Sequence, residues 1–171
     1  MPTFKTDDRL AADRRLRLLV VDDDPHTRML LRDALELRGA DVCVSASARE
    51  AVQALATFCP HVLISDVGMP VEDGYELIGR VRSGERAGRR TPAIACTGHV
   101  GPKDRGRALD AGFDVVVGKP VDLGVLCDAI AHLTEVRGLD GGGSSAAPSA
   151  DDARSRDVRG GDVRSRSAPD S

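Results

Sequence analysis

Acidic residues follow two short apolar runs in the first half of the chain. Asp22 and Asp23 come directly after "RLLVV", and Asp66 follows the apolar run in "HVLISDVGMP". Clustered carboxylates repel one another unless a cation balances them, and oxygen ligands with room for water suit Mg²⁺. A carboxylate can also attack phosphorus and hold it as an acyl phosphate. These acids therefore point to metal binding and phosphoryl transfer.

Two further polar residues follow apolar runs in the second half of the chain. Thr97 comes after "AIAC" and precedes Gly98, and Lys119 comes after "DVVVG" and precedes Pro120. A hydroxyl can donate to a phosphoryl oxygen, and an ammonium can share the negative charge with a metal. A lone residue of this kind is usually solvated or structural. The prediction therefore depends on these positions coming together.

The runs that carry these residues alternate with helical patterns between about residue 17 and about residue 136. Strict alternation predicts an α/β fold, with a doubly wound parallel sheet of five strands and helices on both faces. In such a sheet, ligands bind outside the carboxyl ends of the strands, so the polar residues should meet at one edge. The predicted strands cover 17–21, 41–45, the run from residue 62 that ends at Asp66, 93–96 and 114–118.

Start signals and apolar periodicity predict the helices. Asp24 is an expected N-cap with Pro25 at the first helical position, and Ser47 with Glu50 forms a capping box. Spacing at i, i+3 and i+4 predicts which side chains face inward. Along the chain these are Leu30, Leu31, Ala34, Leu35, Ala51, Val52, Leu55, Gly74, Leu77, Ile78, Val81, Val125, Leu126, Ala129, Ile130 and Leu133.

Composition changes at both ends of the chain. We expect a flexible N-terminal segment over 1–15, a folded domain over 16–137 and a disordered Gly, Ser, Asp and Arg-rich tail over 138–171. The stretch "GGGSSAAPSA" offers too little apolar surface to offset the entropy of ordering. The tail is also too short and too polar for a DNA-binding output domain, so none is expected.

Charge and composition restrict the partners. The formal net charge is -3, and arginines in the tail alternate with acids, so no direct nucleic-acid partner is expected. No signal peptide or membrane-length apolar run is present, which predicts a cytoplasmic protein without a membrane partner. The four cysteines are scattered without a C-x-x-C pair. We expect buried, reduced thiols, rather than a zinc site or disulfides.

Four motifs give the chain a family resemblance over roughly residues 15 to 136: "LLVVDDDP", "VLISDVGMPVEDGYEL", "AIACTG" and "VGKP". They resemble the receiver domain of two-component response regulators, and "DVGMPVEDGYELIGRVR" with "KPVD" is most similar to receivers of hybrid sensor kinases. The resemblance implies a flavodoxin-like sheet in the order 2-1-3-4-5. It also implies that Asp66 takes a phosphoryl group from a sensor histidine kinase or a histidine phosphotransfer protein. Such a module is a stoichiometric phosphoacceptor rather than an enzyme, and it signals by binding a downstream protein, here unknown.

The resemblance also implies a metal site. By this similarity, Asp23 and Asp66 ligate Mg²⁺ together with the backbone carbonyl of Gly68. Asp22 is expected to act largely through water.

Residues at the other two strand ends have implied roles as well. Thr97 would bind one phosphoryl oxygen and Lys119 another, with a cis peptide expected between Lys119 and Pro120. Receivers often carry Tyr or Phe three residues before this lysine as part of a switch, whereas this chain has Val116. His99 is expected near the mouth of the site.

Two other functions fit part of the sequence. A phosphohydrolase of the haloacid dehalogenase type would use the acids of "DDDPH", but His26 stands where Thr or Val is expected, and Asp66 is left without a role. A phosphate-independent scaffold would keep the fold without the chemistry. The intact set of acids, threonine and lysine argues against that alternative.

Overall fold

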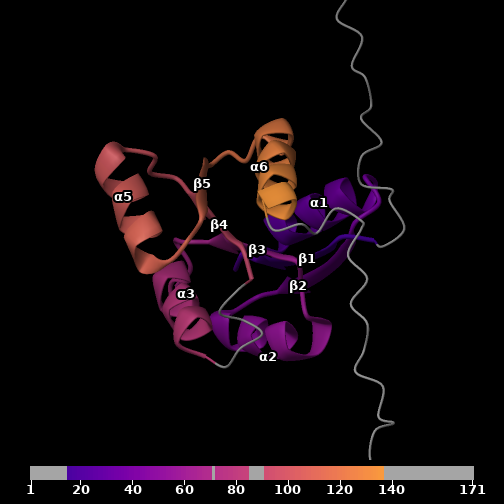
Figure 1. Cartoon of the computed structure of the whole chain (residues 1–171), viewed down its shortest axis with the longest axis horizontal. Coiled ribbons are helices and arrows are strands. Elements are labelled where there is room, and N and C mark those ends of the chain that lie inside the picture. The colour runs from indigo at the N-terminus through magenta and orange to yellow at the C-terminus, as the bar shows by residue number, and fades with distance from the viewer. Residues whose placement is uncertain (1–14, 71, 85–90, 137–171) are drawn as a thin grey trace, which may run out of the picture.

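The computed structural model describes residues 15–70, 72–84 and 91–136 (Figure 1). Apart from Arg15, the predicted N-terminal segment and tail lie outside these residues. Within the described part of the chain, strands and helices alternate, as predicted. They are β1 (Arg17–Val21), α1 (Pro25–Glu36), β2 (Asp41–Ser45), α2 (Ala48–Phe58), β3 (Val62–Asp66), α3 (Gly74–Ser83), β4 (Ala93–Thr97), α5 (Pro102–Ala111), β5 (Val115–Gly118) and α6 (Leu123–Val136).

The five strands form one parallel sheet in the order β2-β1-β3-β4-β5, which confirms the expected topology. After β1 the chain adds β2 on one side and β3 on the other, so the strand order reverses between β1 and β3. The carboxyl ends stay in register across the sheet, since Asp66 pairs with Cys96 and Thr97 pairs with Gly118. The polar residues that follow the strands therefore reach the same edge.

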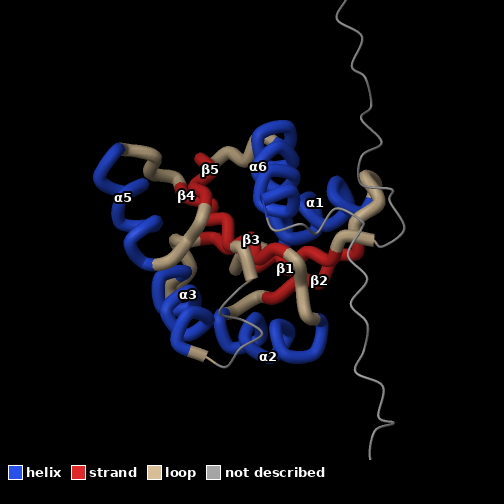
Figure 2. Tube along the Cα trace, in the orientation of Figure 1, coloured by secondary structure: helices blue, strands red, loops and turns tan. Residues whose placement is uncertain are grey.

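Helices cover both faces of the sheet, with α1 and α6 on one side and α2, α3 and α5 on the other (Figures 1 and 2). Successive strand residues point to opposite faces. Leu18 and Val20 pack in a core cluster with α1 and α6, whereas Leu19 and Val21 pack in a second cluster with α2 and α3. Both faces are thus buried, which explains the continuous apolar runs.

The predicted helix starts are present. The side chain of Asp24 accepts from the N–H groups of His26 at 3.3 Å and Thr27 at 3.0 Å. Ser47 Oγ accepts from the N–H of Glu50 at 3.3 Å, and the Glu50 carboxylate accepts from the N–H of Ala46 at 2.8 Å. The reciprocal bond of the capping box therefore goes to the residue before the cap.

Three predictions of inward-facing residues are wrong. Leu30, Val52 and Val125 are 66%, 40% and 53% exposed. Their neighbours along the sequence, on the inward side, are Leu31, Ala51 and Leu126, and all three are buried. A helix turns by about 100° per residue, so a residue next to the centre of the apolar stripe lies on its margin.

The cysteines are free thiols in different surroundings, and the prediction of buried thiols holds only in part. Cys96 is buried, Cys43 and Cys127 are half-buried, and Cys59 is exposed at the carboxyl end of α2. Burial raises the pKa of the Cys96 thiol to about 12. Among the helices that the structure describes, none is both long and apolar enough to cross a membrane.

Candidate functional site

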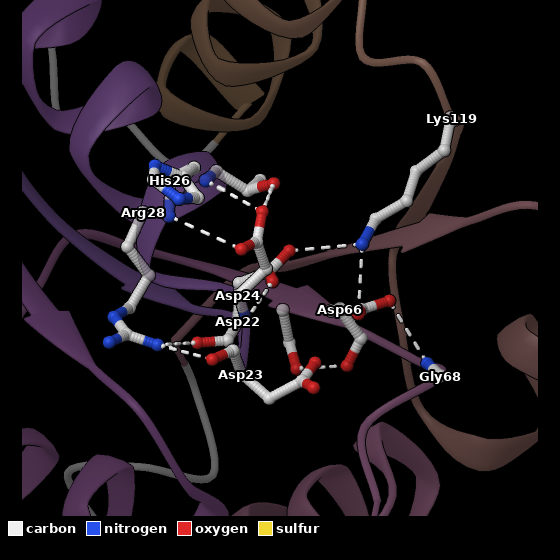
Figure 3. Close-up of polar contacts among 10 residues, drawn as sticks. Asp22, Asp23, Asp24, His26, Arg28, Asp66, Gly68 and Lys119 are labelled. Atoms are coloured by element: carbon white, nitrogen blue, oxygen red, sulfur yellow. Dashed lines mark hydrogen bonds and ion pairs between the residues drawn. The ribbon is translucent and has the colours of Figure 1, made fainter.

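The carboxyl edge of the sheet gathers the acids and the lysine (Figure 3). Asp22 follows β1, Asp66 ends β3, and Lys119 follows β5. The two carboxylates are almost fully buried, with Asp22 2% and Asp66 7% exposed. Charged groups at such depth need a partner of opposite charge.

Lys119 supplies that partner to both acids. Its Nζ lies 3.0 Å from Oδ2 of Asp22 and 2.8 Å from Oδ2 of Asp66. Burial raises the pKa of Asp22, and it outweighs the hydrogen bond from Lys119. Burial lowers the pKa of Lys119, but its hydrogen bonds to Asp66 and Asp22 more than compensate, so the pKa of the ammonium is raised. The lysine is therefore held in its charged form.

A third acid completes a cluster that could bind a metal ion. Asp22, Asp23 and Asp66 each offer a carboxylate oxygen, and these oxygens all lie within 4.8 Å of one another. Asp23 is exposed, which leaves space for water beside the two buried acids. An all-oxygen donor set that is partly open to water fits Mg²⁺, which keeps several water ligands in proteins.

Arg28, on α1, fixes the loop that carries two of these acids. Its guanidinium donates to the backbone carbonyls of Asp22 at 2.5 Å and Asp23 at 2.9 Å (Figure 3). Oδ1 of Asp22 also accepts from the N–H of Asp24 at 2.9 Å. Sequence reasoning missed Arg28, although an arginine in the first turn of the helix after the acids was a usable signal.

The backbone around Asp66 is equally constrained. Gly68 donates its N–H to Oδ1 of Asp66 at 3.0 Å. A Cβ at Gly74 would overlap the carbonyl oxygen of Asp66 and lie 2.8 Å from Cα of Val67. Glycine at this position lets the first residue of α3 approach the end of β3, directly behind the acid.

A pocket of about 460 Å³ lies beside Asp66. Thr97 lines it, and its Oγ1 accepts from the N–H of His99 at 3.1 Å. The full lining is Asp66, Val67, Gly68, Tyr75, Thr97, Gly98, His99, Asp104, Arg107 and Lys119. The pocket thus brings together the Asp66 carboxylate, the Thr97 hydroxyl and the Lys119 ammonium, three groups singled out from the sequence.

The structure also places the peptide after Lys119, the side chain of Val116 and one pair of pocket residues. The Lys119–Pro120 peptide is cis, as expected. Val116 is buried in the core between β5 and the helices α3 and α5. Sequence reasoning did not find Tyr75 and Arg107, whose side chains stack in the pocket with Arg107 Cζ 4.2 Å from the ring centroid.

The strand order is that of the flavodoxin-like α/β proteins. The acids at the ends of β1 and β3 and the lysine after β5 add an acidic site at the point where the strand order reverses. A family model described as the response regulator receiver domain matches residues 18–131. The chain belongs to this family, the receiver domains of two-component systems.

Known relatives support this assignment. The chain is 50% identical over 108 residues to an uncharacterized 14.6 kDa protein in the sodA1 3' region of Leptolyngbya boryana, covering 63% of this chain and 82% of that protein. It is 33% identical over 135 residues to the sensor histidine kinase RcsC of Salmonella typhimurium, covering 79% of this chain but only 14% of the kinase. Among solved structures, the chemotaxis response regulator CheY4 of Vibrio cholerae matches with a TM-score of 0.66 and 27% identity, covering 70% of this chain and 99% of that chain.

Proposed function

We propose that this receiver accepts a phosphoryl group on Asp66 from the phosphohistidine of a sensor histidine kinase or a histidine phosphotransfer protein. The observation that carries the proposal is the position of Lys119, which bridges Asp66 and Asp22 at the acidic edge. A buried carboxylate beside a fixed ammonium and a metal-binding cluster is suited to attack on phosphorus.

In the proposed transfer, an oxygen of Asp66 forms a bond to phosphorus. The bond between phosphorus and the histidine nitrogen breaks, and its electron pair leaves with the imidazole. Lys119 holds one phosphoryl oxygen by its charge, and the Thr97 hydroxyl donates to another. These residues neutralise and orient the group in a pocket that the fold has already formed.

Asp23, Asp66 and the Gly68 carbonyl would hold Mg²⁺, with Asp22 acting largely through water. When bound, the ion supplies positive charge that stabilises the transferring phosphoryl group. The module is a stoichiometric phosphoacceptor, and its output is the binding of a downstream protein. The kinase, phosphotransfer and output partners are inferred from family membership and not from the similarity to RcsC, because the chain spans a small part of that kinase.

Intact mass spectrometry after incubation with acetyl phosphate and Mg²⁺ tests the proposal. The wild type should gain one phosphoryl group, and Asp66→Asn should gain none while remaining folded. Asp104→Asn is the matched control, since Asp104 also lines the pocket but ends no strand. Single phosphorylation of folded Asp66→Asn at the wild-type level would contradict the assignment.

The same experiment addresses the two alternative functions. A phosphohydrolase of the haloacid dehalogenase type would release phosphate from small esters with turnover, whereas a phosphate-independent scaffold would show neither turnover nor modification. Asp66 lines the pocket, whereas Asp22, the first acid of "DDDPH", does not. This difference favours the receiver chemistry over attack by Asp22.

A further inference from the structure

Tyr75 and Arg107 form a pair in the lining of the phosphoacceptor pocket. Tyr75 lies in the first turn of α3, and Arg107 lies on α5, the helix that follows the Thr97 loop. The two helices are neighbours on the same face of the sheet (Figure 1). Both side chains line the pocket that contains Asp66, and the guanidinium lies over the ring at 4.2 Å.

Arg107 is the cation in this pocket that is available for a new partner. The other lining cation, Lys119, is already bonded to Asp22 and Asp66. Within residues 15–70, 72–84 and 91–136, no carboxylate lies within ion-pair distance of Arg107. A partly exposed cation–π contact is weaker than a charge-assisted bond to phosphate. A phosphoryl group in the pocket would therefore compete well against the ring.

Charge balance at the site favours recruitment of one more cation. Four carboxylates lie at the site, those of Asp22, Asp23, Asp66 and the pocket-lining Asp104. They exceed the two cations beside the acids, Lys119 and Arg28, by two charges, which one divalent cation would balance. A phosphoryl group on Asp66 would replace one carboxylate charge by about two. One negative charge is then left over at the mouth of a pocket that Arg107 also lines.

We propose that Arg107 is a second protein cation for the phosphoryl group, and that it leaves the Tyr75 ring to bind the phosphoryl oxygens. This inference rests on the proposed phosphorylation of Asp66. A guanidinium suits the role because its planar set of donors matches phosphate oxygens.

The proposed movement would link the site to α5 directly. Arg107 belongs to α5, so its attraction to the phosphoryl group would pull on that helix. Tyr75 packs against the core cluster that contains Val116, so release of its ring would change the packing of that cluster. The coupling needs no aromatic residue at position 116.

Tyrosine fluorescence gives a direct test. Tyr75 is the single tyrosine, and the chain has no tryptophan, so intrinsic emission reports on this ring alone. Beryllofluoride with Mg²⁺, an acyl phosphate mimic, should change the emission of the wild type. In Arg107→Gln that change should be absent, and the affinity for beryllofluoride should fall about tenfold, the cost of one charge-assisted bond. Arg107→Lys should bind with intermediate affinity.

Two further variants serve as controls. Arg105→Gln removes a neighbouring exposed arginine of α5 that does not line the pocket, and it should behave as the wild type. Tyr75→Leu removes the competing ring, so its affinity for beryllofluoride should equal or exceed that of the wild type. A weaker affinity in Tyr75→Leu would show that the ring holds Arg107 for binding, and it would overturn the proposed exchange.

Detection of bound beryllofluoride by ¹⁹F NMR separates this inference from the proposed function. Absence of binding in the folded wild type would overturn both. Binding with unchanged tyrosine emission and with equal affinity in Arg107→Gln would overturn only the role of Arg107.

Discussion

Lys119 reaches across β4 to pair with Asp66, and its Nζ lies 2.8 Å from Oδ2 of the acid. Lys119 follows β5 and Asp66 ends β3, and these two strands flank β4 in the sheet. The same ammonium contacts Asp22 after β1. One side chain thus ties together the ends of three strands, so its removal should affect both stability and chemistry.

Lys119→Gln should lower the free energy of unfolding by about 1–3 kcal/mol, because two buried carboxylates lose their charged partner. Mg²⁺ should restore more stability to this variant than to the wild type, since it offers a replacement charge to the acids. Urea unfolding with and without Mg²⁺ measures both effects. Lys103→Gln, at an exposed position of α5, is the control and should change neither value. Equal responses of both variants to Mg²⁺ would contradict the bridging role.

Gly74→Ala should destabilise the domain by about 1–3 kcal/mol, because the new methyl group overlaps the backbone of Asp66 and Val67. Gly79→Ala, on the same helix, is the matched control, since its Cβ would have no neighbour within 4 Å. Alanine favours helix over glycine by about 1 kcal/mol, so Gly79→Ala should be neutral or stabilising. Similar losses of stability in both variants would show that helix propensity, rather than close packing behind Asp66, decides the effect.

The polar residues at the ends of apolar runs could be predicted from the sequence. A strand that is buried on both faces is a continuous apolar run, so its end can be located. A parallel topology then brings the carboxyl ends of the strands to one edge. Asp22, Asp66 and Lys119 were found in this way. Contacts between helices were not predictable, since they depend on how each helix is rotated against the sheet. The stacking of Tyr75 and Arg107 is of this kind.

Stability should fall with rising pH through the thiol of Cys96. Burial raises the pKa of this group from 9.0 to about 12, so above pH 9 the unfolded chain releases a proton that the folded chain retains. The contribution is fully present below pH 9 and is lost as the pH rises toward 12, with a limiting slope of about 1.4 kcal/mol per pH unit. Urea unfolding under reducing conditions at pH 8, 9 and 10 measures the slope. Cys96→Ala should show a shallower slope than the exposed-site control Cys59→Ala, and equal slopes would argue against the assignment to Cys96.

Removal of the tail from residue 138 onward should leave the melting temperature and the Mg²⁺ affinity unchanged, because its composition offers no apolar periodicity for docking. Calorimetry and a metal titration of the truncated and full chains provide the comparison. A decrease of several degrees would show that the tail packs on the domain.

Val116 should confine the response to phosphorylation to the loop after Thr97 and to α5. The residue is buried, and its short side chain has few rotamers, so it cannot swing into space that Thr97 vacates. Amide chemical shifts with and without beryllofluoride should change mainly over residues 97–107 in the wild type. In Val116→Tyr the changes should extend into β5, because a ring can then follow Thr97. Val115→Tyr, on the opposite face of the same strand, is the control and should keep the wild-type pattern. If the wild-type response is instead limited to the neighbourhood of Asp66, the site is uncoupled from α5, and the signal must leave through another surface of the domain.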